Sequence, residues 1–178
     1  MFLSKLKPIK AFVLDIDGVL TDATIHVTES GEQLRRFNVR DGYAMQLAVK
    51  KGYLICVISG GKSKSVILRL QGLGITDVHL GITQKVEVYE KFLNQHQLLP
   101  ENVLYMGDDI PDIPVMKITG TCACPADAVE EVKEISDYIS GKNGGEGCVR
   151  DVIEKVLKVQ DSWFDANPTA QEDSVPSI

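Results

Sequence analysis

Short apolar runs alternate with segments of helical period along most of the chain. The apolar runs predict buried strands at 9–14, 53–58, 77–80, 102–106 and 121–124. The segments with the apolar spacing of amphipathic helices lie at 42–51, 63–72, 84–97, 111–117, 127–134 and 147–159. Continuous apolar strands that alternate with helices are typical of a parallel sheet covered on both faces. The pattern therefore predicts an α/β fold with a doubly wound parallel sheet.

Two segments depart from this alternation. Residues 23–39 alternate polar and apolar positions around Ser30-Gly31, which predicts a β-hairpin inserted after the first strand. From Gln160 onward the sequence is polar, acidic and contains prolines, so we expect a flexible tail over 160–178 unless Trp163 and Phe164 dock on the protein. We therefore expect a single domain over 1–159, followed by this tail.

Composition narrows the classes of partner. The chain has 178 residues, 44% of them hydrophobic, and a net charge of −6. This charge gives no bulk attraction to nucleic acid or to an anionic membrane, so an anionic substrate would need local cations. The N-terminal sequence has no signal-peptide pattern, and no apolar stretch is long enough to predict a membrane-spanning helix.

The cysteines and histidines suggest no site of their own. The spacing of the cysteines fits neither a zinc site nor a disulfide framework, so we expect buried reduced thiols in a cytoplasmic protein at Cys56, Cys122, Cys124 and Cys148. The histidines share no motif, and we expect ordinary surface or core roles for His26, His79 and His96.

Chemically active side chains follow four of the predicted strands. Asp15 and Asp17 follow the first, Ser59 and Gly60 the second, Lys85 the third, and the acidic stretch GDD (107–109) the fourth. Because ligands bind outside the carboxyl ends of the strands in open α/β sheets, we expect these groups to face one crevice.

The crowded carboxylates of this crevice need a cation. Asp15, Asp17, Asp108 and Asp109 would raise one another's pKa values if they met without one. Mg²⁺ suits a site of few carboxylates, waters and a substrate phosphate. Lys85 would add a second positive charge there.

The same residues predict phosphoryl transfer. Ser59 and the Gly60 amide at a helix N-terminus offer donors for phosphoryl oxygens. One carboxylate of the first pair can attack phosphorus and form an aspartyl-phosphate, while the other protonates the leaving alkoxide and later activates water. We assign Asp15 as the nucleophile and Asp17 as the general acid/base.

These residues resemble the haloacid dehalogenase superfamily, whose four motifs are matched by DIDGV (15–19), Ser59-Gly60, Lys85 and GDDIPD (107–112). The resemblance implies that the metal is bound by Asp15, by Asp108 and by the carbonyl of Asp17. It implies that Asp109 supports the metal through water. It also implies that Ser59 and Lys85 hold the phosphoryl group and that Asp112 orients its neighbours. Asp17 favours a phosphatase over a dehalogenase, because dehalogenases lack that acid.

A narrower resemblance follows from the short insertions. Only the hairpin separates the first motif from Arg40, so there is no room for a cap domain. The hairpin, FNVRDG (37–42) and GGEGCVRD (144–151) are similar to 3-deoxy-D-manno-octulosonate 8-phosphate phosphatases of lipopolysaccharide precursor biosynthesis, over most of 9–158. Those enzymes are tetramers, in which a neighbouring subunit and its C-terminal tail wall each site, so the resemblance implies a homotetramer.

The resemblance also implies substrate contacts. They involve Asn38, Val39, Arg40, Asp41, Gly42 and Arg69, with Arg40 the best candidate for an anionic sugar. Many relatives have an arginine where this chain has Gly61, which leaves open a related nonulosonate 9-phosphate as substrate. Outside the enzymes, a receiver-like signalling module also clusters carboxylates, a hydroxyl and a lysine. Receivers, however, place an acidic pair first and the phosphorylated aspartate on a later strand.

Overall fold

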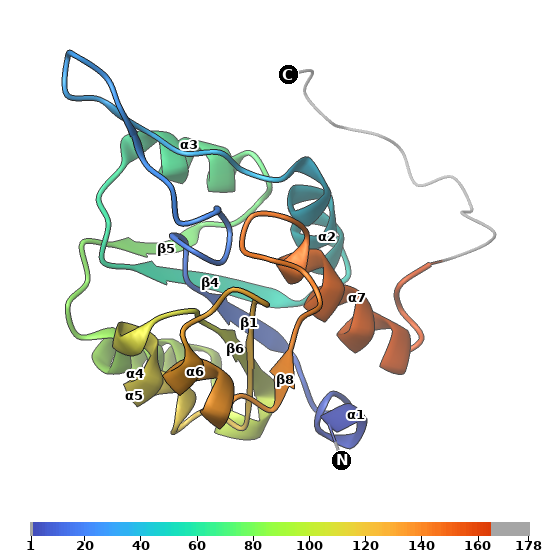
Figure 1. Cartoon of the computed structure of the whole chain (residues 1–178). Coiled ribbons are helices and arrows are strands. Elements are labelled where there is room, and N and C mark those ends of the chain that lie inside the picture. The colour runs from blue at the N-terminus through green and yellow to red at the C-terminus, as the bar shows by residue number, and fades with distance from the viewer. Residues whose placement is uncertain (1, 165–178) are drawn as a thin grey trace.

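The computed structural model describes residues 2–164 (Figure 1). Six strands form one sheet in the order β5-β4-β1-β6-β7-β8, and every neighbouring pair is parallel. The strands are β1 (Ala11–Leu14), β4 (Leu54–Ser59), β5 (Asp77–Leu80), β6 (Val103–Met106), β7 (Thr121–Cys124) and β8 (Tyr138–Ile139). The predicted doubly wound α/β fold is confirmed.

Helices cover both faces of the sheet and enclose two apolar cores. One core includes residues of α2 (Val39–Lys50), α3 (Lys64–Gln71) and α7 (Cys148–Val159). The other includes residues of α4 (Lys85–His96), α5 (Ile113–Met116) and α6 (Glu130–Ile135). Figure 1 shows α2 and α7 side by side on one face, with α4, α5 and α6 on the other. Short 3₁₀ turns, η1 (Pro100–Asn102) and η2 (Ile110–Asp112), precede β6 and α5.

The central strand β1 belongs to both cores. Phe12 and Leu14 pack into the first core, while Ala11 and Val13 pack into the second, because successive side chains of a strand point to opposite faces. All four residues are buried, which explains the continuous apolar run. The backbone of Asp15 still donates to Met106 of β6, so the ladder carries the first catalytic candidate directly to the sheet edge.

The inserted hairpin is short and exposed. Its strands, β2 (His26–Val27) and β3 (Gln33–Leu34), pair antiparallel over two residues each. The alternation over 23–39 predicted this β-hairpin. The following helix begins at Val39 rather than at the predicted residue 42, because the Asn38 side chain accepts the amides of Arg40 and Asp41 as an N-cap. Within residues 2–164 nothing larger than this hairpin is inserted near the first strand, so there is no cap domain.

The short elements β8 and α1 (Phe2–Lys5) were not predicted. The start of the predicted tail is ordered. After α7, the Gln160 amide donates to the carbonyls of Leu6 and Ile9, and the Arg150 guanidinium lies 5.1 Å from the Trp163 ring centroid. The prediction for 165–178 lies outside the described residues. Among the helices of 2–164, none has the length and apolar content needed to cross a membrane.

Candidate active site

The residues predicted from four strand ends meet at one edge of the sheet. Asp15 follows β1, Ser59 ends β4, Lys85 begins α4 after β5, and Asp108 follows β6. These strands are neighbours in the order β5-β4-β1-β6, so their carboxyl ends lie next to one another. The parallel topology brings together groups that are up to 93 residues apart in the sequence.

Lys85 is buried between two carboxylates. Its Nζ lies 3.1 Å from Asp15 Oδ2 and 2.7 Å from Asp112 Oδ1. Burial alone would lower the pKa of Lys85, but the two negative charges outweigh burial and raise it. Lys85 is therefore a fixed positive charge beside the candidate nucleophile.

Asp112 is a fully buried organiser of this edge. Its Oδ1 accepts from Lys85 Nζ and, at 2.6 Å, from the Tyr105 hydroxyl. Its Oδ2 accepts the amides of Asp108 at 3.1 Å and Asp109 at 3.4 Å. With four donors on two oxygens, Asp112 orients its neighbours, as the resemblance implied.

The structure contains a place for a cation between Asp15 and Asp108. One carboxylate oxygen each of Asp15, Asp108 and Asp112 lie within 4.8 Å of one another. The Oδ1 atoms of Asp15 and Asp108 are buried and have no hydrogen-bond partner among residues 2–164. Two unpartnered carboxylate oxygens form a donor set that suits Mg²⁺, which takes one or two protein carboxylates and fills its other positions with water and phosphate.

The pKa values of the two carboxyls are raised by burial and by their carboxylate neighbours. Burial raises the pKa of Asp15 to about 7, and the charge of Asp112 adds to the rise while Lys85 opposes it. Burial, followed by the charges of Asp15, Asp112 and Asp109, raises the pKa of Asp108 to about 8. A dication between them would favour both ionised forms.

Asp17 is held by the hairpin. Arg35, next to β3, donates from Nε to Asp17 Oδ1 at 2.6 Å and from Nη2 to Oδ2 at 3.2 Å. The Arg35 side chain is only 4% exposed, although it belongs to a mostly exposed hairpin. An ideal Cβ built on Gly61 would lie 3.0 Å from Asp17 Oδ2 and 3.3 Å from Arg35 Nη2. The absence of a side chain at Gly61 thus leaves the space in which Arg35 reaches Asp17.

The side chains of Ser59 and Asp109 both make local hydrogen bonds. The buried Ser59 hydroxyl accepts the Gly61 amide at 3.1 Å and keeps its own proton to donate. The exposed Asp109 accepts the Ile110 amide at 2.8 Å and caps the turn that follows. Gly60 is exposed at the end of β4.

Two glycines allow close approaches to the loop that follows β1. Gly18 has φ +97°, and an ideal Cβ there would lie 1.9 Å from Asp108 Oδ2. An ideal Cβ on Gly144 would lie 1.9 Å from the Gly18 carbonyl oxygen. No side chain fits at either position, so Gly18 allows Asp108 to lie against the loop after β1, and Gly144 allows the 144–147 loop to lie against the same loop.

The residues predicted to contact substrate fall into two groups. Val39 and Arg40 are exposed and, with Asn38, Arg36 and Gly145, line a cleft of about 410 Å³. Asp41 and Gly42 are buried at the start of α2.

The buried pair has structural contacts. Asp41 accepts the amides of Gly147 at 3.2 Å and Arg150 at 2.7 Å and so caps α7. An ideal Cβ on Gly42 would lie 2.6 Å from Arg69 Nη2, which places Arg69 directly beside α2.

Comparisons with known proteins identify the family of this chain. A sequence profile of the haloacid dehalogenase-like hydrolases matches residues 71–153. The chain is 38% identical to the 3-deoxy-D-manno-octulosonate 8-phosphate phosphatase KdsC of Escherichia coli K12, over 89% of this chain and 84% of that protein. The chain belongs to the 3-deoxy-D-manno-octulosonate 8-phosphate phosphatase family.

Solved structures of this phosphatase family share the fold. The enzyme from Moraxella catarrhalis, in complex with a magnesium ion, a phosphate ion and a KDO molecule, has a TM-score of 0.88 and 31% identity, over 91% of this chain and 93% of that one. The cobalt-bound enzyme from Haemophilus influenzae has a TM-score of 0.86 and 33% identity, over 89% and 93% of the two chains.

Sequence patterns did not reveal how this phosphatase-family site is supported. The alternation of the hairpin does not show that Arg35 folds over Asp17. Tyr105 is one of several apolar-run residues of β6, and nothing local marks its hydroxyl as a partner of Asp112. The repeated glycines of the 144–147 loop were the visible signal for a close approach.

Proposed function

We propose that this chain is a Mg²⁺-dependent phosphatase that hydrolyses 3-deoxy-D-manno-octulosonate 8-phosphate to the free sugar acid and phosphate, in lipopolysaccharide precursor biosynthesis. The observation that carries the proposal is the buried Asp15 carboxylate, with Lys85 at 3.1 Å on one oxygen and the other oxygen unpartnered beside Asp108. The 38% identity to a phosphatase of that name supports the choice of substrate.

In the proposed mechanism, an oxygen of Asp15 attacks phosphorus and the bond to the sugar oxygen breaks. Asp17 gives its proton to the leaving alkoxide, so the sugar acid departs as an alcohol. Asp17 then takes a proton from water, whose oxygen attacks the aspartyl-phosphate and releases phosphate. Lys85, the Ser59 hydroxyl and the Gly60 amide hold the phosphoryl oxygens throughout.

The metal would be held by Asp15, by Asp108 and by the carbonyl of Asp17. Asp109 would act through water. When bound, Mg²⁺ supplies positive charge that offsets the phosphoryl oxygens and the crowded carboxylates. The unpartnered Oδ1 atoms of Asp15 and Asp108 support this assignment.

The sugar acid would lie in the cleft lined by Asn38, Val39 and Arg40. The cleft has two exposed cations, Arg36 and Arg40. Arg36 already pairs with Asp22, so Arg40 would pair with the sugar carboxylate. Asp41, Gly42 and Arg69 lie just behind, and we assign them to shaping the cleft rather than to direct contact, because Asp41 already accepts two backbone amides.

We also propose a cytoplasmic homotetramer in which the C-terminal tail reaches a neighbouring site. Exposed apolar side chains on the hairpin support association through it, namely Ile25, Val27 and Leu34. Four buried free cysteines suit a reducing compartment. Sedimentation at micromolar protein tests the assembly, and a monomer there would contradict it.

The decisive experiment measures phosphate release from eight-carbon and nine-carbon 2-keto-3-deoxy sugar-acid phosphates, with Mg²⁺ or with EDTA. We expect Mg²⁺-dependent turnover that favours the eight-carbon ester. Asp15→Asn should abolish it, and the surface carboxylate variant Glu90→Gln should not. Turnover without Asp15, or no turnover on any ester, would refute the proposal. Preference for a nine-carbon ester would refute the substrate alone, and the relatives named above do not favour that outcome.

A further inference from the structure

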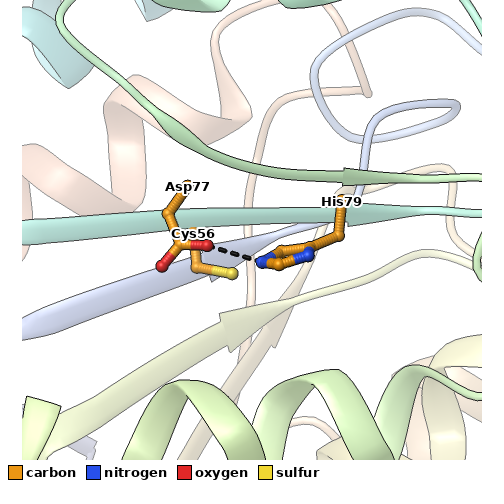
Figure 2. Close-up of side chains that lie close together, drawn as sticks. All are labelled: Cys56, Asp77 and His79. Carbon is orange, nitrogen blue, oxygen red and sulfur yellow. Dashed lines mark hydrogen bonds and ion pairs between the residues drawn. The ribbon is translucent and has the colours of Figure 1, made fainter. Parts of the chain in front are cut away.

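A second group of metal-binding side chains lies away from the catalytic edge. Cys56 of β4 is paired in register with Asp77 of β5, so both side chains point to the face covered by α4. His79 lies two residues after Asp77 and therefore shares that face. Figure 2 shows the Cys56 thiol, the Asp77 carboxylate and the His79 ring converging on one point.

The three side chains are within reach of a single ion. One ligand atom from each of Cys56, Asp77 and His79 lies within 4.8 Å of the other two. Ligands of a tetrahedral zinc ion lie roughly 3.2–3.7 Å apart, given bond lengths of about 2.0–2.3 Å. Small side-chain movements would give this spacing. One of them separates His79 Nε2 from Asp77 Oδ1, because these two atoms are hydrogen-bonded at 2.5 Å.

A second imidazole contacts Asp77 from the helix that covers this face. His96, the last residue of α4, has its Nε2 3.6 Å from the other oxygen of Asp77. Asp77 therefore lies between two imidazoles, with the thiol of Cys56 on the same side of the sheet. Both imidazoles are partly exposed, at 40% for the His79 side chain and 26% for that of His96, so both can adjust.

The group is also accessible. A cavity of about 340 Å³ opens beside it, lined by Asp77, His96, Thr76, Phe92 and Gln95 among others. An ion can thus reach Asp77 and His96 through this cavity, and the partly exposed His79 side chain is accessible from solvent. Cys56 is fully buried and forms the inner wall of the site.

We propose that Cys56, Asp77 and His79, with His96 as the fourth ligand, form a binding site for a divalent transition-metal ion of the Zn²⁺ type. A thiol with two imidazoles and one carboxylate is a zinc-like donor set, whereas Mg²⁺ prefers oxygen ligands alone. The sulfur binds as thiolate, and its proton passes to water as the ion enters. The ion would join β4, β5 and the end of α4, and this proposal does not depend on the proposed phosphatase activity.

The ligands come from three separate elements, which is why the sequence gives no zinc-like cysteine spacing. The local signal is the Asp77-x-His79 pair on a predicted strand, since a spacing of two places both side chains on one face. His79 and His96 thus have a shared role that their sequence positions alone do not indicate.

Cobalt binding tests the site through its sulfur. Co²⁺ is titrated into the protein in excess Mg²⁺, which occupies the carboxylate site, with a non-thiol reductant present. We expect one Co²⁺ per chain with a thiolate-to-cobalt charge-transfer absorption, displaced by Zn²⁺. The catalytic carboxylates contain no sulfur and cannot give this absorption. Its absence from the wild-type protein would overturn the proposal.

Matched variants identify the ligands. Cys56→Ser should abolish the charge-transfer absorption, and His79→Gln should weaken Co²⁺ binding roughly tenfold or more. The controls, Cys122→Ser for a buried thiol elsewhere and His26→Gln for an exposed imidazole, should bind as wild type. Should Cys56→Ser fail to fold, His79→Gln at the partly exposed edge decides the question alone. Absorption that persists in Cys56→Ser, or unchanged affinity in His79→Gln, would refute the site.

Discussion

The guanidinium of Arg35 makes a bidentate contact with the carboxylate of Asp17, with Nε donating to Oδ1 at 2.6 Å and Nη2 donating to Oδ2 at 3.2 Å. The hairpin thereby contributes a buried cation to the residue that we propose as general acid/base. The contact fixes the direction of the carboxylate, but it occupies the oxygens that must exchange a proton with the substrate.

We expect Arg35→Ala to lower kcat roughly tenfold, equivalent to about 1.4 kcal/mol, with a smaller change in KM. The physical reason is that Asp17 loses the partner that orients it. Steady-state kinetics of phosphate release measure the effect. Lys158→Ala is the control, since Lys158 is an exposed cation that pairs with Glu154 on α7, away from the catalytic edge. An increase in kcat would instead mean that the pair holds Asp17 back.

Asp112 should be the most stabilising carboxylate of the site. Asp112→Asn leaves a single oxygen for four donors and turns an amide N–H₂ toward one of them, so we expect a loss of about 3 kcal/mol or more in the free energy of unfolding. Tyr105→Phe removes only one donor and should cost about 1 kcal/mol. Urea unfolding of both variants checks this order, and equal losses would contradict it.

Metal binding should alter how stability depends on pH. The pKa values of Asp15 and Asp108 are raised to about 7 and about 8 in the folded protein. The folded metal-free protein therefore keeps protons that the unfolded chain has released, and its stability falls as pH rises from about 4 to about 8. Mg²⁺ favours both ionised carboxylates, so the melting temperature should rise more with Mg²⁺ at about pH 9 than at about pH 6.

Thermal unfolding with EDTA or Mg²⁺ at the two pH values measures this difference. A double variant, Asp15→Asn with Asp108→Asn, should show a flatter pH dependence without metal. An equal gain from Mg²⁺ at both pH values would count against the carboxylate pair as the binding site.

Gly144→Ala should disrupt the contact between the two loops. Its Cβ would lie 1.9 Å from the Gly18 carbonyl oxygen and 2.8 Å from that of Thr21, so the backbone must shift. We expect a loss of about 2–3 kcal/mol in stability and a marked fall in activity, because the shift reaches the loop that carries Asp17. Gly141→Ala, with nothing within 4 Å of its Cβ, is the control. Normal activity in Gly144→Ala would contradict the packing role.

Arg40 and Asp41 are neighbours with separable roles. Arg40→Ala should raise KM roughly tenfold with little change in stability, because it removes one exposed charge-assisted contact to the sugar acid. Asp41→Ala should instead cost about 2 kcal/mol of stability, because two backbone amides at the start of α7, those of Gly147 and Arg150, lose their acceptor. Kinetics and unfolding on both variants test the split. A rise in KM for Asp41→Ala at normal stability would restore Asp41 as a direct substrate contact.

The main strands and the convergence of the motifs were predictable for a physical reason. Strands buried on both faces appear as continuous apolar runs, and their carboxyl ends share one edge because the sheet is parallel. Asp15, Ser59, Lys85 and Asp108 follow directly. The elements β8 and α1 have two and four residues, too few to show a period, and they are held by contacts with distant parts of the chain.

The contacts that support the site were not predictable in the same way. Arg35 is one of two adjacent arginines, and only the path of the hairpin decides which of them is buried on Asp17. The four donors to Asp112 come from residues 85, 105, 108 and 109. They meet at one carboxylate only in the folded chain, so no local pattern shows it.

The hydrogen bonds from Gln160 to the carbonyls of Leu6 and Ile9 fasten the end of the last helix to the segment that enters the first strand. The segment after the last helix therefore lies next to the segment before the first strand. A circular permutant that links residue 164 to residue 2 and opens new termini at the exposed hairpin tip, near Gly31, should keep the order of its sheet. The same catalytic edge would then form in a chain whose termini lie in the hairpin.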